Sequence, residues 1–271
     1  MSRHIQISFS GITQQQNELL LAHLSEAGFD GFEEEEGSLK AFITEPAWNE
    51  AELQEIALRM GLNYAKDTLE ETNWNQLWES NFEPVIVDDF VAVRADFHQP
   101  VPNVELEIII TPKMSFGTGH HSTTWLVMRQ MKKLDLMGKS IFDFGTGTGI
   151  LAILAEKLGA ASVLAIDNDE WSIKNAAENI QRNGCNKVEI KFAGMPGNDQ
   201  HFDIILANIN KNVILEHIDT LSKQISAGGC LVLSGLLAED EKDVLAKAVM
   251  LGLRLISRKE RDNWLLLRLA P

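Results

Sequence analysis

A chain of 271 residues, 45% hydrophobic and 23% charged, has the composition of a folded globular protein with room for two modest domains, which excludes fibrous and disordered classes. Its formal net charge of −15 argues against direct nucleic-acid binding, which needs clustered Lys and Arg. The sequence shows no apolar run of roughly 20 residues and no signal-peptide pattern, so we expect a cytoplasmic protein without membrane contact. It has only two cysteines, so we expect no disulfide framework.

The first 72 residues predict a small α+β domain. Its expected elements are a strand over residues 4–9, a helix over 14–29, two strands within 29–44 that turn at Gly37, a helix over 49–62 and a strand over 64–71. The order strand, helix, strand, strand, helix, strand is that of the split βαβ, or ferredoxin-like, arrangement.

Most of the negative charge lies in this part of the chain. Residues 1–84 hold 16 acidic against 4 basic residues, a balance of −12, which leaves −3 for the remainder. A surface of this sign attracts a basic protein, so residues 1–72 are interpreted as a substrate-recognition domain. The alternative is acidity that only keeps the chain soluble.

Residues 73–84 predict a linker helix with one apolar stripe, and a second domain follows over 85–271. After strands within 84–97 and 104–111, the expected helices cover 122–134, 149–158, 169–183, 210–224 and 238–250, and the expected strands cover 140–144, 162–167, 188–192, 203–207 and 229–235. This alternation predicts a parallel sheet covered on both faces. A final pair of strands, near 253–260 and 264–269, predicts an antiparallel hairpin at one edge.

The stretch DFGTGTGILAILAEKLGA, residues 143–160, places Gly145, Gly147 and Gly149 between an apolar strand and an apolar helix. Glycines allow positive φ and let backbone N–H groups approach a ligand at the carboxyl end of a strand. The next strand ends in Asp167, where a carboxylate can accept both hydroxyls of a ribose. Together they predict a nucleoside site. The alternatives are a turn that only packs strand against helix, and Asp167 as a helix N-cap.

The nucleoside site has competing functional interpretations. The spacing G-x-G-x-G differs from the dinucleotide pattern G-x-G-x-x-G, because Ile150 stands at the third glycine. A nicotinamide-dependent dehydrogenase is therefore the weaker enzyme hypothesis. A cofactor-sensing adaptor without catalysis is the non-enzymatic one.

DFGTGTGILAI, AIDND and IILANI resemble the nucleoside-binding motifs of class I S-adenosylmethionine-dependent methyltransferases, and KMSFGTGHHSTTWLVMRQM is similar to the FGTG-H-x-TT signature of the ribosomal protein L11 methyltransferases. The resemblance covers nearly the whole chain. It implies a Rossmann-like α/β domain with a mostly parallel seven-stranded sheet and S-adenosyl-L-methionine as the cofactor.

The resemblance also implies a protein N-methyltransferase that modifies lysine ε-amines and the N-terminal α-amine of L11, which the acidic N-terminal domain captures. We expect a monomer. The alternative is an enzyme of the same fold acting on another protein or on a small-molecule amine.

Carried onto this sequence, the resemblance assigns cofactor contacts to Phe116, Thr118, Gly119, Thr124, Gly145, Gly147, Asp167 and Asn208. Asn208 is also the catalytic candidate, because its carboxamide oxygen, or the backbone carbonyls near it, can accept hydrogen bonds from an incoming neutral amine. A plain turn is the alternative for this residue, and a hinge with an ordinary N-cap is the alternative for the FGTG segment.

No metal is expected, because the sulfonium already activates the methyl group and the protein's main task is alignment. The adjacent His120 and His121 do not share a helix face, which disfavours a metal site. The stretch KFAGMPGND, after the following strand, offers no acid for an adenine amine. Backbone atoms and Met195 are left for that contact.

Overall fold

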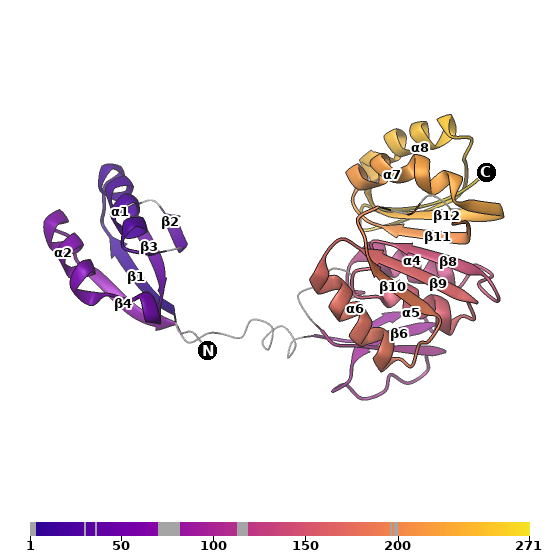
Figure 1. Cartoon of the computed structure of the whole chain (residues 1–271), viewed down its shortest axis with the longest axis horizontal. Coiled ribbons are helices and arrows are strands. Elements are labelled where there is room, and N and C mark those ends of the chain that lie inside the picture. Colours follow the sequence, from indigo (N-terminus) through magenta and orange to yellow (C-terminus); the bar gives the residue numbers. More distant parts are fainter. Residues whose placement is uncertain are drawn as a thin grey trace. The chain divides into compact units, whose positions relative to one another are not determined.

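The computed structural model describes residues 4–29, 31–35, 37–69, 82–112, 119–195, 197 and 200–271. The chain forms two compact units, residues 1–77 and 78–271 (Figure 1). The predicted linker helix over 73–84 lies mostly outside the described residues, and its last three residues have no regular secondary structure. Each unit is therefore described by itself.

The N-terminal unit contains β1 (His4–Ser10), α1 (Gln14–Glu26), β2 (Gly31–Glu35), β3 (Ser38–Thr44), the 3-10 turn η1 (Glu45–Ala47), α2 (Glu50–Met60) and β4 (Tyr64–Leu69). The sheet order is β2-β3-β1-β4 and all neighbours are antiparallel. Both helices pack on one face, where alternate residues of β1 and β3, such as Ile7 and Leu39, meet Leu20 of α1 and Leu53 of α2. The expected ferredoxin-like arrangement is confirmed.

The main sheet of the C-terminal unit consists of β8 (Ser140–Phe144), β9 (Ser162–Asp167), β10 (Val188–Phe192), β11 (Phe202–Asn208), β12 (Ile225–Leu237), β13 (Arg254–Arg261) and β14 (Trp264–Ala270). Its order is β10-β9-β8-β11-β12-β14-β13, with the first five strands parallel and β14 antiparallel to both of its neighbours. The mostly parallel seven-stranded sheet with an edge hairpin is thus confirmed. The order of the strands reverses between β8 and β11, where sheets of this kind bind ligands.

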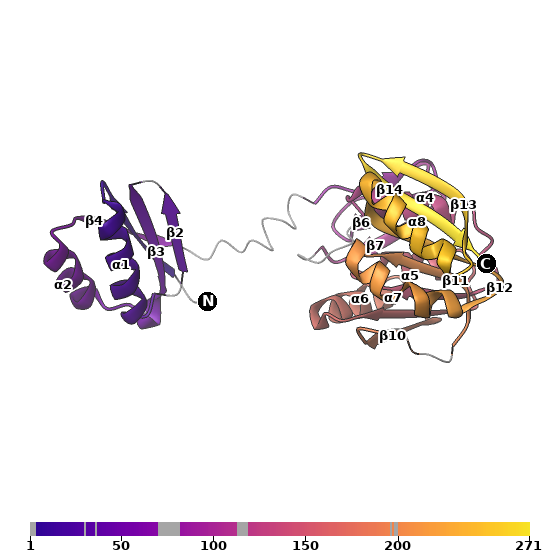
Figure 2. The ribbon, with the colours of Figure 1, turned by 90° about the horizontal axis from the view of Figure 1, so that it is seen from above.

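Helices cover both faces of this sheet (Figures 1 and 2). One face carries α4 (Ser122–Met131), α5 (Ile150–Lys157) and α6 (Glu170–Arg182), and the other carries α7 (Lys211–Lys223) and α8 (Glu241–Met250), which follows the 3-10 turn η2 (Ala238–Asp240). Successive strand residues alternate between the two cores, since Ile141 faces α5 while Phe142 faces the α7 side. Among the described helices, none has the length and apolar character that crossing a bilayer requires.

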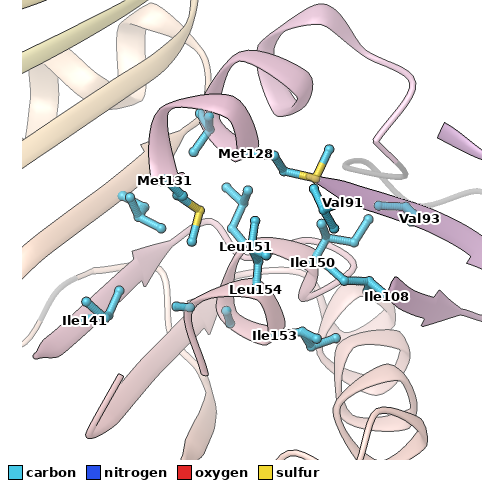
Figure 3. Close-up of a cluster of buried hydrophobic side chains, with 14 of the residues drawn as sticks. Val91, Val93, Ile108, Met128, Met131, Ile141, Ile150, Leu151, Ile153 and Leu154 are labelled. Atoms are coloured by element: carbon cyan, nitrogen blue, oxygen red, sulfur yellow. The ribbon is translucent and has the colours of Figure 1, made fainter. Parts of the chain in front are cut away.

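A second, small sheet of this unit was not foreseen as a separate element. It joins β5 (Val85–Val87), β6 (Val91–Ala95) and β7 (Leu106–Ile110), with β5 and β6 antiparallel and β6 and β7 parallel. Figure 3 shows Val91 beside Met128 of α4, and Ile108 beside Ile150 of α5. The expected strands are therefore present, but they cover α4 and α5 and do not extend the main sheet.

Candidate active site

Three neighbouring strands end side by side at the carboxyl edge of the main sheet. The register pairs Phe144 of β8 with Ile166 of β9 and with Ala207 of β11. The next residue along each strand is Gly145, Asp167 or Asn208. Parallel pairing therefore brings together three residues that the sequence analysis singled out separately.

These strand ends border a cavity of 620 Å³, a volume typical of small-molecule sites. The glycine loop, Asp167 and Asn208 line it, as does Thr124. Its other lining residues are His121, Thr123, Phe144, Ile150, Leu151, Asn168, Asp169, Ser172, Ala193, Gly194, Ile209, Asn210, Val213, Gly235 and Trp264.

The glycine loop needs glycine for space as well as for its backbone angles. Gly145 has φ 77°, and a Cβ added there would lie 2.3 Å from Cγ2 of Ile209. Its N–H groups, however, are already used within the protein. Those of Gly145 and Thr146 donate to Ile166 O at 3.0 and 2.9 Å, and that of Gly147 donates to Asp167 Oδ2 at 2.8 Å. The loop's own turn and the Asp167 carboxylate therefore pair these three N–H groups.

The Asp167 carboxylate is oriented by two backbone N–H groups. Oδ2 accepts from Gly147, and Oδ1 accepts from Asp169 N at 3.0 Å. The N-cap of α6 is Asp169, whose side chain accepts from Trp171 N and Ser172 N, so the N-cap alternative for Asp167 was wrong. Each carboxylate oxygen has a second lone pair, so Asp167 can accept hydroxyls from a ligand in the cavity.

A second carboxyl, Asp143, lies beneath the loop and does not line the cavity. It is fully buried, and Thr146 Oγ1 donates to its Oδ2 at 2.6 Å. Burial raises the pKa of the Asp143 carboxyl to about 7, the charge of Asp167 adds to this rise, and the Thr146 hydrogen bond opposes it. Asp143 is therefore only partly ionised near neutral pH.

The side chain of Asn208 links the end of β11 to the first turn of α4 by a hydrogen bond. Its Nδ2 donates to Thr124 Oγ1 at 3.1 Å, across 84 positions of sequence. Its Oδ1 is buried and accepts no hydrogen bond from any described residue. A buried acceptor without a partner is costly, so Asn208 presents a hydrogen-bonding capacity that a ligand can satisfy.

An aromatic pair that the sequence analysis missed borders the same cavity. The rings of His121 and Trp264 meet edge to face with centroids 4.5 Å apart. His121 Nδ1 accepts from Thr123 N and thereby caps α4. Trp264 follows a turn in which Asp262 and Asn263 have positive φ, typical of a two-residue hairpin. The hairpin could be predicted from the sequence, but the position of its Trp264 beside the cavity could not.

The stretch after β10, which the sequence analysis left with backbone atoms and Met195 for the adenine contact, contributes two residues to the cavity. Ala193 N donates to Asp167 O at 2.9 Å, and Ala193 and Gly194 line the cavity beside Asn168. Met195 is exposed and does not line it. In the part of the chain that the structure describes, no three His, Cys, Asp or Glu side chains come together as a metal site.

Of the FGTG signature, residues 116–119, the structure describes only Gly119. Phe116 and Thr118 lie outside the described residues. Gly119 is described with φ 96°, and a Cβ there would lie 3.6 Å from Val85 and Val93. Gly119 thus packs against β5 and β6 and does not line the cavity, while Thr124 does.

Two asparagines, the buried Asn179 and the half-buried Asn183, connect α6 to the glycine loop and to β7, which leads toward this signature. Asn179 Nδ2 donates to Thr148 O at 2.9 Å, and its Oδ1 accepts from Thr111 N at 2.8 Å. One turn later, Asn183 bonds both the N–H and the C=O of Ile109. Helix α6 and its C-cap therefore connect the glycine loop to β7 and to Thr111, the residue that follows β7.

The whole chain is similar to one family of known proteins. The family model described as Ribosomal protein L11 methyltransferase (PrmA) matches residues 30–270. A protein named ribosomal protein L11 methyltransferase from Porphyromonas gingivalis is 42% identical over 262 residues, which cover 94% of this chain and 90% of the relative. A protein of the same name from Chlorobaculum parvum is 35% identical and covers 99% of this chain and 96% of the relative.

Among solved structures, a ribosomal protein L11 methylase from Lactobacillus delbrueckii subsp. bulgaricus matches with a TM-score of 0.65 and 28% identity. The match covers 70% of this chain and 98% of that protein. The motif resemblance, the family model and the fold therefore agree.

Proposed function

The chain belongs to the ribosomal protein L11 methyltransferase family, whose methyl donor is S-adenosylmethionine, and we propose that it methylates lysine ε-amines and the N-terminal α-amine of L11. The observation that carries the proposal is the buried Asn208 Oδ1, which lacks a partner among the described residues and belongs to the cavity that Asp167 and the glycine loop line.

The residues present fit the cofactor. Asp167, oriented by Gly147 N and Asp169 N, accepts the ribose hydroxyls, and the bare Cα of Gly145 leaves room beside Ile209. Ala193 and Gly194 offer backbone atoms to the adenine. When bound, the cofactor supplies a sulfonium whose methyl group is already electrophilic, so the protein needs no metal or covalent nucleophile for the transfer.

Asn208 orients the amine in this proposal. Its Nδ2 is held by Thr124 Oγ1, which leaves Oδ1 to accept an N–H from a neutral lysine or α-amine. An amine held in this way directs its lone pair toward the methyl group, and orientation of this kind is a large part of catalysis of a two-reactant step. His121 and Trp264 form the apolar wall along which the aliphatic part of a lysine packs.

The acidic N-terminal unit captures L11. Residues 1–77 hold 14 acidic against 4 basic residues, a balance of −10. On the edge strand β2, Glu33 is 60% exposed and pairs with Lys40. Charge of one sign on one unit speeds the encounter with a basic protein and orients it.

Mass spectrometry of purified L11 after incubation with the protein and S-adenosylmethionine tests the proposal. We expect methyl groups on the N-terminal α-amine and on lysines. Asn208→Ala should lower kcat by about 100-fold and leave cofactor affinity within a few-fold, because the hydrogen bond serves the amine. Asn186→Ala, which removes an exposed amide away from the cavity, is the matched control and should retain full activity. Unmodified L11, or equal activity of the two variants, would contradict the proposal.

A further inference from the structure

A second cavity, of 380 Å³, lies between α4 and the end of β13. We call it the basic groove. Trp125, Leu126, Arg129, Gln130, Lys133, Lys259, Glu260 and Arg261 line it. Four of these eight side chains are cationic and one is anionic, in a protein of net charge −15.

The indole ring of Trp125 contacts both arginines of the groove. The guanidinium of Arg261 lies 4.0 Å from the centre of the Trp125 ring, and that of Arg129 lies 5.1 Å from it. Trp125 is itself held by a hydrogen bond from Nε1 to Ile86 O at 3.2 Å. A guanidinium stacked on an aromatic ring keeps its in-plane N–H donors for an oxygen anion, and stacking limits its freedom before the anion arrives.

The groove keeps an excess of positive charge. Arg129 pairs with Asp88 at 2.9 Å, and Arg261 lies 3.4 Å from Asp262. Lys133 and Lys259 are exposed and form no ion pair with any residue in the described ranges. The two lysines are therefore available to an anionic partner.

The groove adjoins the active site through two shared segments. On α4, Trp125 in the groove directly follows Thr124 in the cofactor cavity. On the β13–β14 hairpin, Arg261 lines the groove and Trp264 lines the cavity. The two segments are tied together by a hydrogen bond from Ser122 Oγ to Asp262 Oδ2 at 2.6 Å.

We propose that the basic groove binds a short acidic segment of the protein substrate and thereby selects amines that lie near carboxylates. This proposal rests on the proposed function and names a substrate determinant for the same site. A nucleic acid is the less favoured occupant, because a protein of charge −15 repels a long polyanion, whereas a segment with a few carboxylates meets mainly the local cations.

The test is the double variant Lys133→Glu/Lys259→Glu in the full chain. Its matched control, Lys242→Glu/Lys247→Glu on α8, changes the net charge equally at two exposed lysines that form no ion pair with the described residues. Methyl transfer to intact L11 is measured over a range of salt concentrations. Binding of a fluorescent deca-glutamate peptide and of a fluorescent 20-nucleotide oligouridylate is measured in parallel.

We expect the groove variant to raise the KM for L11 about tenfold at low salt, with kcat and cofactor affinity unchanged, and to weaken the peptide complex by a similar factor. The control should match the wild type. A KM change below twofold, an equal change in the control, or groove-dependent binding of the RNA and not of the peptide would overturn the proposal. Failure of the proposed function is distinguishable, because the wild type would then transfer no methyl to L11 while peptide binding still reports on the groove.

Discussion

Replacing Asn179 by Ala should separate the glycine loop from the strand that leads toward the FGTG segment. Asn179 is fully buried on α6. Its Oδ1 accepts from Thr111 N at 2.8 Å, and its Nδ2 donates to Thr148 O at 2.9 Å and to Asn175 Oδ1 at 3.1 Å. No alanine can replace any of these three hydrogen bonds.

The expected loss follows from the groups left behind. An orphaned buried polar group costs about 1–3 kcal/mol, and Thr111 N–H loses its Asn179 partner in this variant. With a small additional cost for the space vacated, the free energy of unfolding of the C-terminal unit should fall by about 2–4 kcal/mol. Because Thr148 lies between Gly147 and Gly149, the looser loop should also raise the Kd for S-adenosylmethionine about tenfold.

Asn183→Ala is the matched control. It is the C-cap residue of the same helix and bonds Ile109 of β7, but it forms no hydrogen bond with the glycine loop among the described residues. Urea unfolding measures stability, and titration calorimetry measures cofactor affinity. Both variants should lose stability, and only Asn179→Ala should lose affinity. Equal Kd values for the two variants would refute the claim that Asn179 positions the loop.

Four other outcomes are expected. Asp167→Ala should weaken cofactor binding by about 1–3 kcal/mol in calorimetry, and unchanged affinity would remove Asp167 from the site. The pKa of Asp143 is raised from 3.8 to about 7, so the folded state binds more protons between these values. Stability should therefore fall as pH rises from about 4 to 7, by at most about 4 kcal/mol. Asp143→Asn should flatten that part of the urea-unfolding profile, and an unchanged slope would contradict this. Gly235→Ala should lower the midpoint of thermal unfolding by several degrees, because Gly235 has φ 83° and the added Cβ would lie 2.2 Å from Ile209 O. An unchanged midpoint would contradict this, because it would mean that the backbone shifts without cost. Deleting residues 1–77 should preserve cofactor binding but abolish L11 methylation in mass spectrometry, and equal methylation would refute the docking role of the acidic unit.

The amino-acid sequence by itself determined the order and type of the main elements, because hydrophobic periodicity and glycine placement act over a few residues. The ferredoxin-like unit, the parallel sheet and the edge hairpin were all readable in this way. The positions of Gly145, Asp167 and Asn208 were readable too, since each ends or directly follows a predicted strand. The cofactor role that we propose for all three comes from motif resemblance, and the comparisons confirm the family.

Only the tertiary structure decided which distant side chains meet. Asn208 forms a hydrogen bond with Thr124, and the rings of Trp264 and His121 are in contact. The guanidinium of Arg261 lies over the Trp125 ring. These contacts depend on strand register, on the return of a hairpin and on the packing of α4, and none of these is encoded in local periodicity. The tertiary structure also showed that the glycine loop uses several of its N–H groups internally, because hydrogen bonds follow the folded path of the backbone and cannot be counted from residue types.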